Sequence, residues 1–151
     1  YTQGMEALII DLRGNPGGNL STVCSMLDLI LPEGTIVYTE DRDGQKRYAE
    51  SDEEHKLEIP LTVLADSASA SASEIFAGAV QDYGIGTIVG TTTYGKGVVQ
   101  QIFNLSDGTC MKLTISEYFT PKGRNIDGKM WKWNMNITKR ILKRIISLIK
   151  P

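Results

Sequence analysis

Hydrophobic and polar positions along the chain are arranged in blocks that predict alternating strands and helices. Residues 6–12 (EALIIDL) form an apolar, β-branched run that is typical of a buried strand. Residues 20–31 carry apolar side chains at helical spacing, and Pro32 and Gly34 end that pattern. Further strands are predicted over residues 35–39, 61–65, 86–89, 98–105 and 109–119.

A second helix is predicted over residues 70–83, between two of these strands. Gly84 follows it and fits a helix C-terminus that needs a left-handed residue. The apolar positions that share one face are Ile75, Phe76, Ala79, Val80 and Tyr83. Strands that alternate with helices and end in a strand pair predict a mixed α/β domain, with helices packed on a sheet.

Two segments depart from this pattern. Residues 40–58 are rich in charge and contain Asp43-Gly44, a hairpin or loop signal, so we expect an exposed, mobile segment there. Residues 137–150 (ITKRILKRIISLIK) combine apolar positions at helical spacing with lysines and arginines, which predicts a basic amphipathic helix. Such a helix either docks on the domain through its apolar face or binds a membrane surface or a partner.

Composition narrows the class of protein. The 151 residues are 41% hydrophobic and 23% charged with a net charge of −2, which is ordinary for one globular domain and does not favour nucleic acid as a partner. No apolar run has the length of a membrane span, and no signal peptide opens the chain. A buried strand so close to the first residue leads us to expect a piece of a larger protein. Cys24 and Cys110 lack metal-binding spacing, and we expect both to be buried thiols without a disulfide.

A serine-rich run, SASASEIF (residues 69–76), opens the second predicted helix. Ser71 and Glu74 have the spacing of a capping box, so one interpretation is that Ser71 only caps the helix. The other is that Ser71 is a nucleophile at a helix start, where backbone N–H groups and the helix dipole stabilise an oxyanion. Ala72 would supply one such N–H, and Gly17 or Gly18 of the preceding glycine-rich loop would supply another.

A serine nucleophile needs a base, and Lys96 is the strongest candidate in the chain. The single histidine, His55, lies among charged residues (SDEEHK), which indicates a solvated loop and not a Ser-His-Asp triad. Lys96 lies between Gly95 and Gly97 at the entrance to an apolar strand, where burial would lower its pKa and leave the amine neutral. Gln100 would lie on the same face of that strand and hold the amine without adding a charge.

The same glycines raise a nucleotide-binding alternative. Residues 90–96 (GTTTYGK) contain most of a phosphate-binding loop, and Asp11 ends an apolar strand as a magnesium-binding aspartate would. However, Gly97 occupies the position where Ser or Thr should bind magnesium. A strand is predicted next, instead of the helix whose N-terminus would hold the phosphates. The sequence therefore does not favour nucleotide binding.

Together these motifs resemble the carboxyl-terminal processing (tail-specific) proteases, which are serine peptidases of the S41 type. The motifs that carry the resemblance are residues 12–18 (LRGNPGG), 69–75 (SASASEI), 94–100 (YGKGVVQ), 105–108 (LSDG) and 118–121 (YFTP). The resemblance implies Ser71 as the nucleophile, Lys96 as the general base and Gln100 as the residue that orients the lysine. The implied oxyanion hole consists of the N–H groups of Gly18 and Ala72. The implied fold is an α/β fold with a crotonase/ClpP-like core of mixed sheet and packed helices.

The resemblance also implies a division of the chain. We interpret residues 1–128 as a partial S41-type catalytic core and residues 129–151 as a divergent basic amphipathic tail. The family normally carries a PDZ domain before this core, and these residues contain none. In the tail, KMWKWNMN stands where the family usually continues to a Pro-Asp pair.

The implied activity is that of a serine endopeptidase that cleaves proteins near their C-termini through a Ser-Lys dyad, with no cofactor and no metal. Its partners would be unfolded or C-terminal segments of protein substrates. A homo-oligomer and membrane contact by the tail both stay open. Enzymes of this kind act in the periplasm or outside the cell, some of them associated with the membrane. The alternative is a catalytically idle peptide-binding module of the same fold, although intact Ser71, Lys96 and Gln100 argue against a degenerate site.

Overall fold

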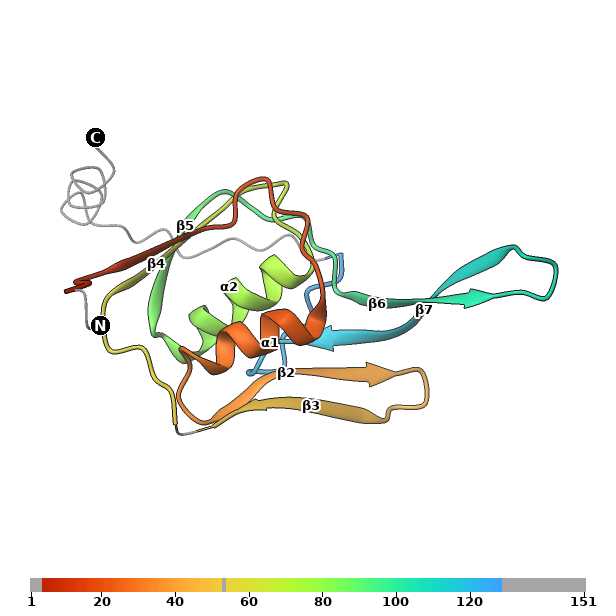
Figure 1. Cartoon of the computed structure of the whole chain (residues 1–151), viewed down its shortest axis with the longest axis horizontal. Helices are drawn as coiled ribbons and strands as arrows, with labels where there is room; N and C mark the ends of the chain where they lie inside the picture. Colours follow the sequence, from red (N-terminus) through yellow and green to blue (C-terminus); the bar gives the residue numbers. More distant parts are fainter. Residues whose placement is uncertain (1–3, 53, 129–151) are drawn as a thin grey trace.

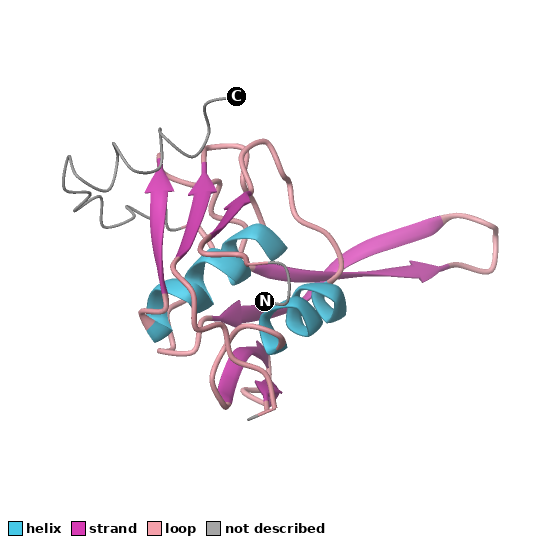
Figure 2. Ribbon diagram, turned by 60° about the vertical axis from the view of Figure 1, so that its left-hand side comes forward, coloured by secondary structure: helices cyan, strands magenta, loops and turns pink. Residues whose placement is uncertain are grey.

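The computed structural model describes residues 4–52 and 54–128, which build two β-sheets with helices between them (Figure 1). The helices are α1 (Leu20–Asp28) and α2 (Ala72–Tyr83). Figure 2 shows the same layering from a second direction. The predicted α/β architecture with packed helices is confirmed, and its parallel and antiparallel strands lie in separate sheets.

The first sheet is parallel. Its strands are β1 (Leu8–Asp11), β4 (Leu61–Ala65) and β5 (Gly86–Gly90), in the order β1-β4-β5. Val63 at the centre has no exposed surface, and it pairs with Ile10 on one side and Ile88 on the other. The predicted apolar runs therefore form this sheet, but the expectation of buried strands was wrong for β1, whose residues are half-buried or exposed, and β4 alternates buried with half-buried residues. The cause is that the described helices lie on the side of this sheet that faces the second sheet (Figure 1).

The second sheet is antiparallel, in the order β3-β2-β7-β6. Its strands are β2 (Gly34–Asp41), β3 (Lys46–Ser51), β6 (Val98–Asn104) and β7 (Cys110–Phe119). The predicted Asp43-Gly44 turn joins β2 to β3, and Asp41 Oδ1 accepts the Asp43 N–H at 2.9 Å. Residues 46–51 of the segment expected to be exposed and mobile form strand β3, which pairs with β2, and most of its side chains are exposed as expected.

Helix α2 is buried almost all round, although the sequence pattern predicted only one apolar face. Its polar residues Ser73, Glu74 and Asp82 are buried together with that face. The cause is the position of the helix, which contacts β5 of one sheet, β2 of the other and α1 beside it. Gly84 ends the helix in the left-handed conformation with a φ of 69°, as predicted.

The β6–β7 hairpin extends away from the rest of the molecule (Figures 1 and 2). Its predicted turn is present, with Asp107 Oδ1 accepting the Thr109 N–H at 3.0 Å. Apolar side chains along the hairpin are exposed: Ile102, Phe103, Met111 and Leu113. Cys110 lies on this hairpin and is exposed, so the expectation that it is buried was wrong. Cys24 is half-buried, and both thiols are free.

Two predictions concern the C-terminal residues, which the structure does not describe. The predicted helix over residues 137–150 lies outside the described residues, so its docking or membrane role stays a prediction. The same holds for the division into a core (1–128) and a tail (129–151). Within the described part of the chain, neither helix has the length and apolar character that crossing a membrane requires.

Candidate active site

The loops that follow the three parallel strands meet at one edge of the first sheet. This follows from the topology, because the carboxyl ends of parallel strands lie at the same edge. Ser69 joins the loops: its hydroxyl donates to the Leu12 carbonyl at 2.7 Å, and its own carbonyl accepts the Tyr94 N–H at 3.0 Å. The Asp66 carboxylate adds a bond from the Gly14 N–H at 3.0 Å. Segments far apart in sequence therefore form one connected site.

Of the three alternating serines, the outer two serve the fold. Ser69 has no exposed surface, and the hydroxyl of buried Ser73 donates to the Asn15 carbonyl at 3.0 Å. Ser71, between them, is half-buried and lines a pocket. The outer hydroxyls thus tie the start of α2 to the first loop, whereas the Ser71 hydroxyl faces the pocket and bonds to the Tyr118 side chain there.

The backbone at Ser71 adopts a conformation that non-glycine residues rarely take. Its φ of 56° and ψ of −115° match the first central residue of a type II′ turn, and the Ser73 N–H donates to the Ala70 carbonyl at 3.1 Å. Among the residues that the structure describes, Ser71 is the only non-glycine residue with positive φ. Such a conformation costs about 1–3 kcal/mol and is concentrated at functional sites.

Glu74 holds the backbones of both candidate residues. Its Oε2 accepts the N–H groups of Ser71 and Lys96, each at 2.9 Å, and its Oε1 accepts the Gly95 N–H at 2.7 Å. Glu74 is 1% exposed, so these charge-assisted bonds are shielded from water. The capping-box spacing seen in the sequence therefore describes only part of its role, because Glu74 also binds the loop after β5.

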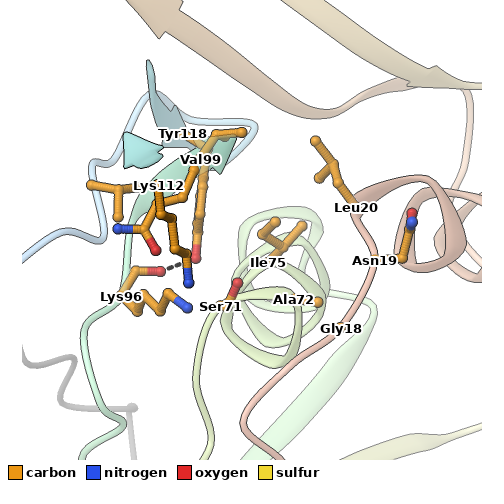
Figure 3. A pocket seen from close by; sticks show the side chains of 12 residues that line it. Gly18, Asn19, Leu20, Ser71, Ala72, Ile75, Lys96, Val99, Lys112 and Tyr118 are labelled. Atoms are coloured by element: carbon orange, nitrogen blue, oxygen red, sulfur yellow. Dashed lines mark hydrogen bonds between the residues drawn. The ribbon is translucent and has the colours of Figure 1, made fainter. Parts of the chain in front are cut away.

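The structure brings the residues singled out from the sequence around one pocket of about 340 Å³. They are Ser71, Lys96, Gln100, Gly18 and Ala72. Figure 3 shows the Lys96 amine and the Ser71 hydroxyl directed toward the same space. Lys96 is partly buried, and its amine makes no hydrogen bond or ion pair within the described residues.

Gly17 brings the two candidate oxyanion donors together. A Cβ at Gly17 would lie 2.6 Å from the Ala70 carbonyl oxygen and 2.8 Å from the Ala72 nitrogen, and its φ is 98°, so only glycine fits. Its neighbour Gly18 therefore lies close to the start of α2. In the part of the chain that is described, neither the Gly18 nor the Ala72 N–H donates a hydrogen bond. Both N–H groups are therefore candidate donors to an oxyanion beside Ser71, where the helix dipole would add to their effect.

Gln100 lines the pocket, but its amide bonds elsewhere. Its Nε2 donates to Thr114 Oγ1 at 3.4 Å across the hairpin, and no hydrogen bond joins it to Lys96 among the described residues. A bulge between Val99 and Gln100 interrupts the strand alternation on which the sequence argument depended. The orienting role of Gln100 stays a prediction.

Sequence reasoning gave no role in the site to Lys112 or to Tyr118, although Tyr118 lies in one of the motifs that carry the resemblance, and both line the pocket. The Tyr118 hydroxyl donates to the Lys96 carbonyl, and burial raises the pKa of the phenol, so it stays protonated through neutral pH. Lys112 points into the pocket from β7 (Figure 3). Both residues come from a strand whose register with β6 cannot be read from the pattern of apolar positions.

The described residues give little support to a metal site or a phosphate-binding site. Asp52, Glu54 and His55 bring possible metal-ligand atoms within 4.8 Å of one another, but all three are exposed and none lines the pocket. Exposed acidic groups of this kind are common without a metal. The loop after β5 leads into strand β6 and not into a helix, so a phosphate group would meet no helix N-terminus there.

The arrangement is suited to acyl transfer. A hydroxyl can attack a carbonyl carbon when a neighbouring amine takes its proton and preorganised N–H donors stabilise the oxyanion. Ser71, Lys96, Gly18 and Ala72 present these groups around one pocket.

Comparisons with known proteins agree with this chemistry. The model of Peptidase family S41 matches residues 1–137. The Carboxyl-terminal-processing protease of Synechocystis sp. is 45% identical over 124 residues, which are 82% of this chain and 29% of that protein. The Carboxy-terminal processing protease CtpB of Bacillus subtilis is 41% identical over 126 residues, 83% of this chain and 26% of that protein. Among solved structures, the photosystem II D1 C-terminal processing protease matches with a TM-score of 0.81 and 33% identity, over 88% of this chain and 35% of that one.

Proposed function

The chain belongs to peptidase family S41, and we propose that it is the catalytic core of a serine endopeptidase that cleaves proteins near their C-termini. The family match confirms the resemblance found in the motifs, and the structural match confirms the predicted fold class. The chain spans 29% of the Synechocystis protein and 26% of the Bacillus protein. The activity of a whole protein is therefore proposed here from the site and from the names of its relatives.

One observation supports a Ser-Lys dyad most strongly. The Ser71 hydroxyl and the Lys96 amine enter the same pocket, and the Lys96 amine has no competing partner in the described part of the chain. Their backbones are joined through the carboxylate of Glu74. A serine held in a strained turn before a helix, with an amine beside it, matches the requirements of nucleophilic catalysis.

In the proposed reaction, uncharged Lys96 takes the proton from Ser71 Oγ as that oxygen bonds to the scissile carbonyl carbon. The N–H groups of Gly18 and Ala72 stabilise the oxyanion. When the carbon–nitrogen bond breaks, the Lys96 ammonium returns its proton to the leaving amine. A water molecule, deprotonated by Lys96, then attacks the acyl-Ser71 ester and releases the second product. Gln100 is proposed to orient the lysine amine when substrate displaces its bond to Thr114.

We propose that the substrate binds as an extended strand. β6 is an edge strand of the second sheet, and its first residues, Val98 and Val99, line the pocket. An exposed edge offers unpaired backbone groups to a peptide, which is the usual basis of strand addition. Unfolded or C-terminal segments of proteins can present such a backbone, whereas a folded domain cannot.

The localisation and the extent of the catalytic core, which the family resemblance implied, are also proposals. We place its action in the periplasm or outside the cell, in association with the membrane or free of it. We treat residues 1–128 as the catalytic core. An idle peptide-binding module of the same fold is the alternative, because the chain contains only part of the length of its relatives.

The test is cleavage of an unstructured peptide, followed by mass spectrometry. Replacing Ser71→Ala or Lys96→Met should lower the rate at least about a thousandfold while circular dichroism stays unchanged. Lys46→Met is the control, because Lys46 is an exposed lysine paired with Glu40 on the β2–β3 hairpin. Undiminished cleavage by the Lys96→Met chain would exclude the dyad. Peptide binding by the wild-type chain with no cleavage would support the idle module.

A further inference from the structure

The pocket contains a second lysine that the proposed reaction does not use. We propose that Lys112 forms a carboxylate-binding site, which holds a carboxylate on the part of the substrate that leaves after cleavage. The inference rests on the proposed function, because it takes the direction of the substrate from the roles of Ser71 and Lys96.

The position of Lys112 follows from the register of the hairpin. Lys112 lies opposite Ile102, and Thr114 lies opposite Gln100, so these four side chains share one face of the hairpin. Gln100 and Lys112 both line the pocket from that face. Figure 3 shows the Lys112 side chain running from β7 toward the ends of Ser71 and Lys96.

The charges around the pocket are unbalanced. Lys96 and Lys112 are the charged side chains among its lining residues, and no carboxylate is among them. Lys112 makes no hydrogen bond or ion pair with any described residue. The N-terminus of the 12-residue helix α2, at Ser71 and Ala72, adds positive potential on the opposite side. Because Lys96 must be uncharged to accept a proton, Lys112 is the side chain that can pair with an anion there.

The reaction indicates which part of the substrate carries that anion. Lys96 returns its proton to the leaving amine, so the residues after the scissile bond pass beside Lys96. The candidate oxyanion donor Gly18 lies on the other side of Ser71, whereas Lys112 lies on the side of Lys96 (Figure 3). A carboxylate on the first or second residue after the scissile bond can therefore reach Lys112. It is either the α-carboxylate of a short C-terminal fragment or an Asp or Glu side chain.

The experiment uses the 151-residue chain and a peptide series with one scissile sequence. One arm compares Glu with Gln at each of the two positions after the scissile bond. A second arm compares a free with an amidated C-terminus two residues after that bond. Binding is measured by fluorescence anisotropy on the Ser71→Ala chain, and kcat/KM is measured on the chain with Ser71 intact. Both are repeated with Lys112→Met, with Lys112→Arg and with the control Lys46→Met.

A partly exposed ion pair contributes up to about 1 kcal/mol, which is a preference of about fivefold for the carboxylate peptide. We expect that preference in binding and in kcat/KM, a decrease with added salt, its loss in Lys112→Met and its retention in Lys112→Arg and Lys46→Met. The arm that shows the preference identifies the α-carboxylate or the acidic side chain as its source. Equal binding of carboxylate and amide peptides in both arms would overturn the inference, as would a preference that persists in Lys112→Met. If no peptide is cleaved but the Lys112-dependent preference in binding remains, the proposed hydrolysis fails and the carboxylate site stands.

Discussion

Glu74 Oε2 accepts the N–H of Lys96 at 2.9 Å, and the same oxygen accepts the N–H of Ser71 at the same distance. One buried carboxylate oxygen therefore links the backbone of the proposed nucleophile to the backbone of the proposed base. The link joins the loop after β5 to the start of α2, two segments that no β-ladder connects. We therefore expect the separation of the two reacting groups to depend on Glu74.

Replacing Glu74→Gln should disturb the site and the fold together. The amide keeps one acceptor oxygen and brings an N–H₂ group against backbone N–H donors, so buried donors lose their partners. We expect a loss of about 3 kcal/mol in the free energy of unfolding, measured with urea, and a lower kcat with little change in KM. Glu50→Gln on the exposed face of β3 is the matched control. A Glu74→Gln chain with unchanged kcat would contradict the positioning role.

The glycine loop after β1 offers a matched pair of alanine substitutions. Gly17→Ala would bring a Cβ to 2.8 Å from Ser71 Cβ, whereas a Cβ at Gly14 would meet nothing within 4 Å. Both glycines have positive φ, 98° and 69°, so both substitutions carry backbone strain. Gly14→Ala should cost about 1 kcal/mol of stability, and Gly17→Ala about 1–3 kcal/mol more because its contacts include backbone atoms.

The rate of peptide cleavage should also differ between the Gly17→Ala and Gly14→Ala variants. Gly17→Ala should abolish most peptide cleavage, since it moves the Gly18 donor away from Ala72, and Gly14→Ala should keep it. Equal activity in the two variants, measured on folded protein, would mean that close packing at Gly17 is unimportant for the oxyanion site.

Strain at Ser71 predicts an unusual order of stability among inactive variants. Ser71→Ala keeps the disfavoured φ of 56°, whereas Ser71→Gly removes the steric cost. Thermal unfolding should therefore show Ser71→Gly to be more stable than Ser71→Ala by about 1 kcal/mol, after allowing for the greater unfolded-state entropy of glycine. If Ser71→Ala is the more stable of the two, the turn does not have the strained geometry described.

The Asp66 carboxylate should make the free energy of unfolding depend on pH in the acidic range. The bond from the Gly14 N–H is the main cause that holds the pKa of this carboxyl below its usual value of 3.8, with further bonds from Ala68 and Ser69. A carboxyl whose pKa is lowered by folding stabilises the fold above its unfolded pKa, and that contribution is lost as pH falls through the lowered value. Wild type should therefore exceed Asp66→Asn in unfolding free energy at pH 7, and the difference should shrink below pH 4. A difference that stays constant across this range would exclude the linkage.

Most of the parallel sheet could be predicted from the sequence, because its strands are short apolar runs bounded by glycine and proline. Residues 61–65 were predicted with the bounds that β4 has. β3 was missed since its exposed residues Lys46, Arg47 and Tyr48 resemble a solvated loop, and only pairing with β2 makes them a strand. Cys110 was misplaced for a related reason: a two-stranded hairpin without a covering layer exposes residues that a packed strand would bury.

Some residues of the candidate site could likewise be predicted from the sequence, and others could not. Ser71, Lys96 and the glycine loop lie in motifs whose residue types reveal their chemistry, so they could be found without coordinates. The strain at Ser71 and the double role of Glu74 depend on how distant loops meet, which spacing alone does not show. Tyr118 and Lys112 depend on strand register, and the bulge at Gln100 changes that register locally.

The most direct measurement of the central claim is covalent labelling of Ser71 by a peptidyl phosphonate, because a phosphonate reacts with an activated serine and not with an ordinary one. Intact mass and peptide mapping should locate one label on Ser71, while the exposed Ser67 and Ser106 in the same chain stay unmodified. Lys96→Met should slow the labelling at least about a hundredfold, in proportion to the loss of general-base catalysis. Labelling of Ser71 at the same rate in the wild-type and Lys96→Met chains, or no labelling of folded wild type, would contradict activation of Ser71 by Lys96.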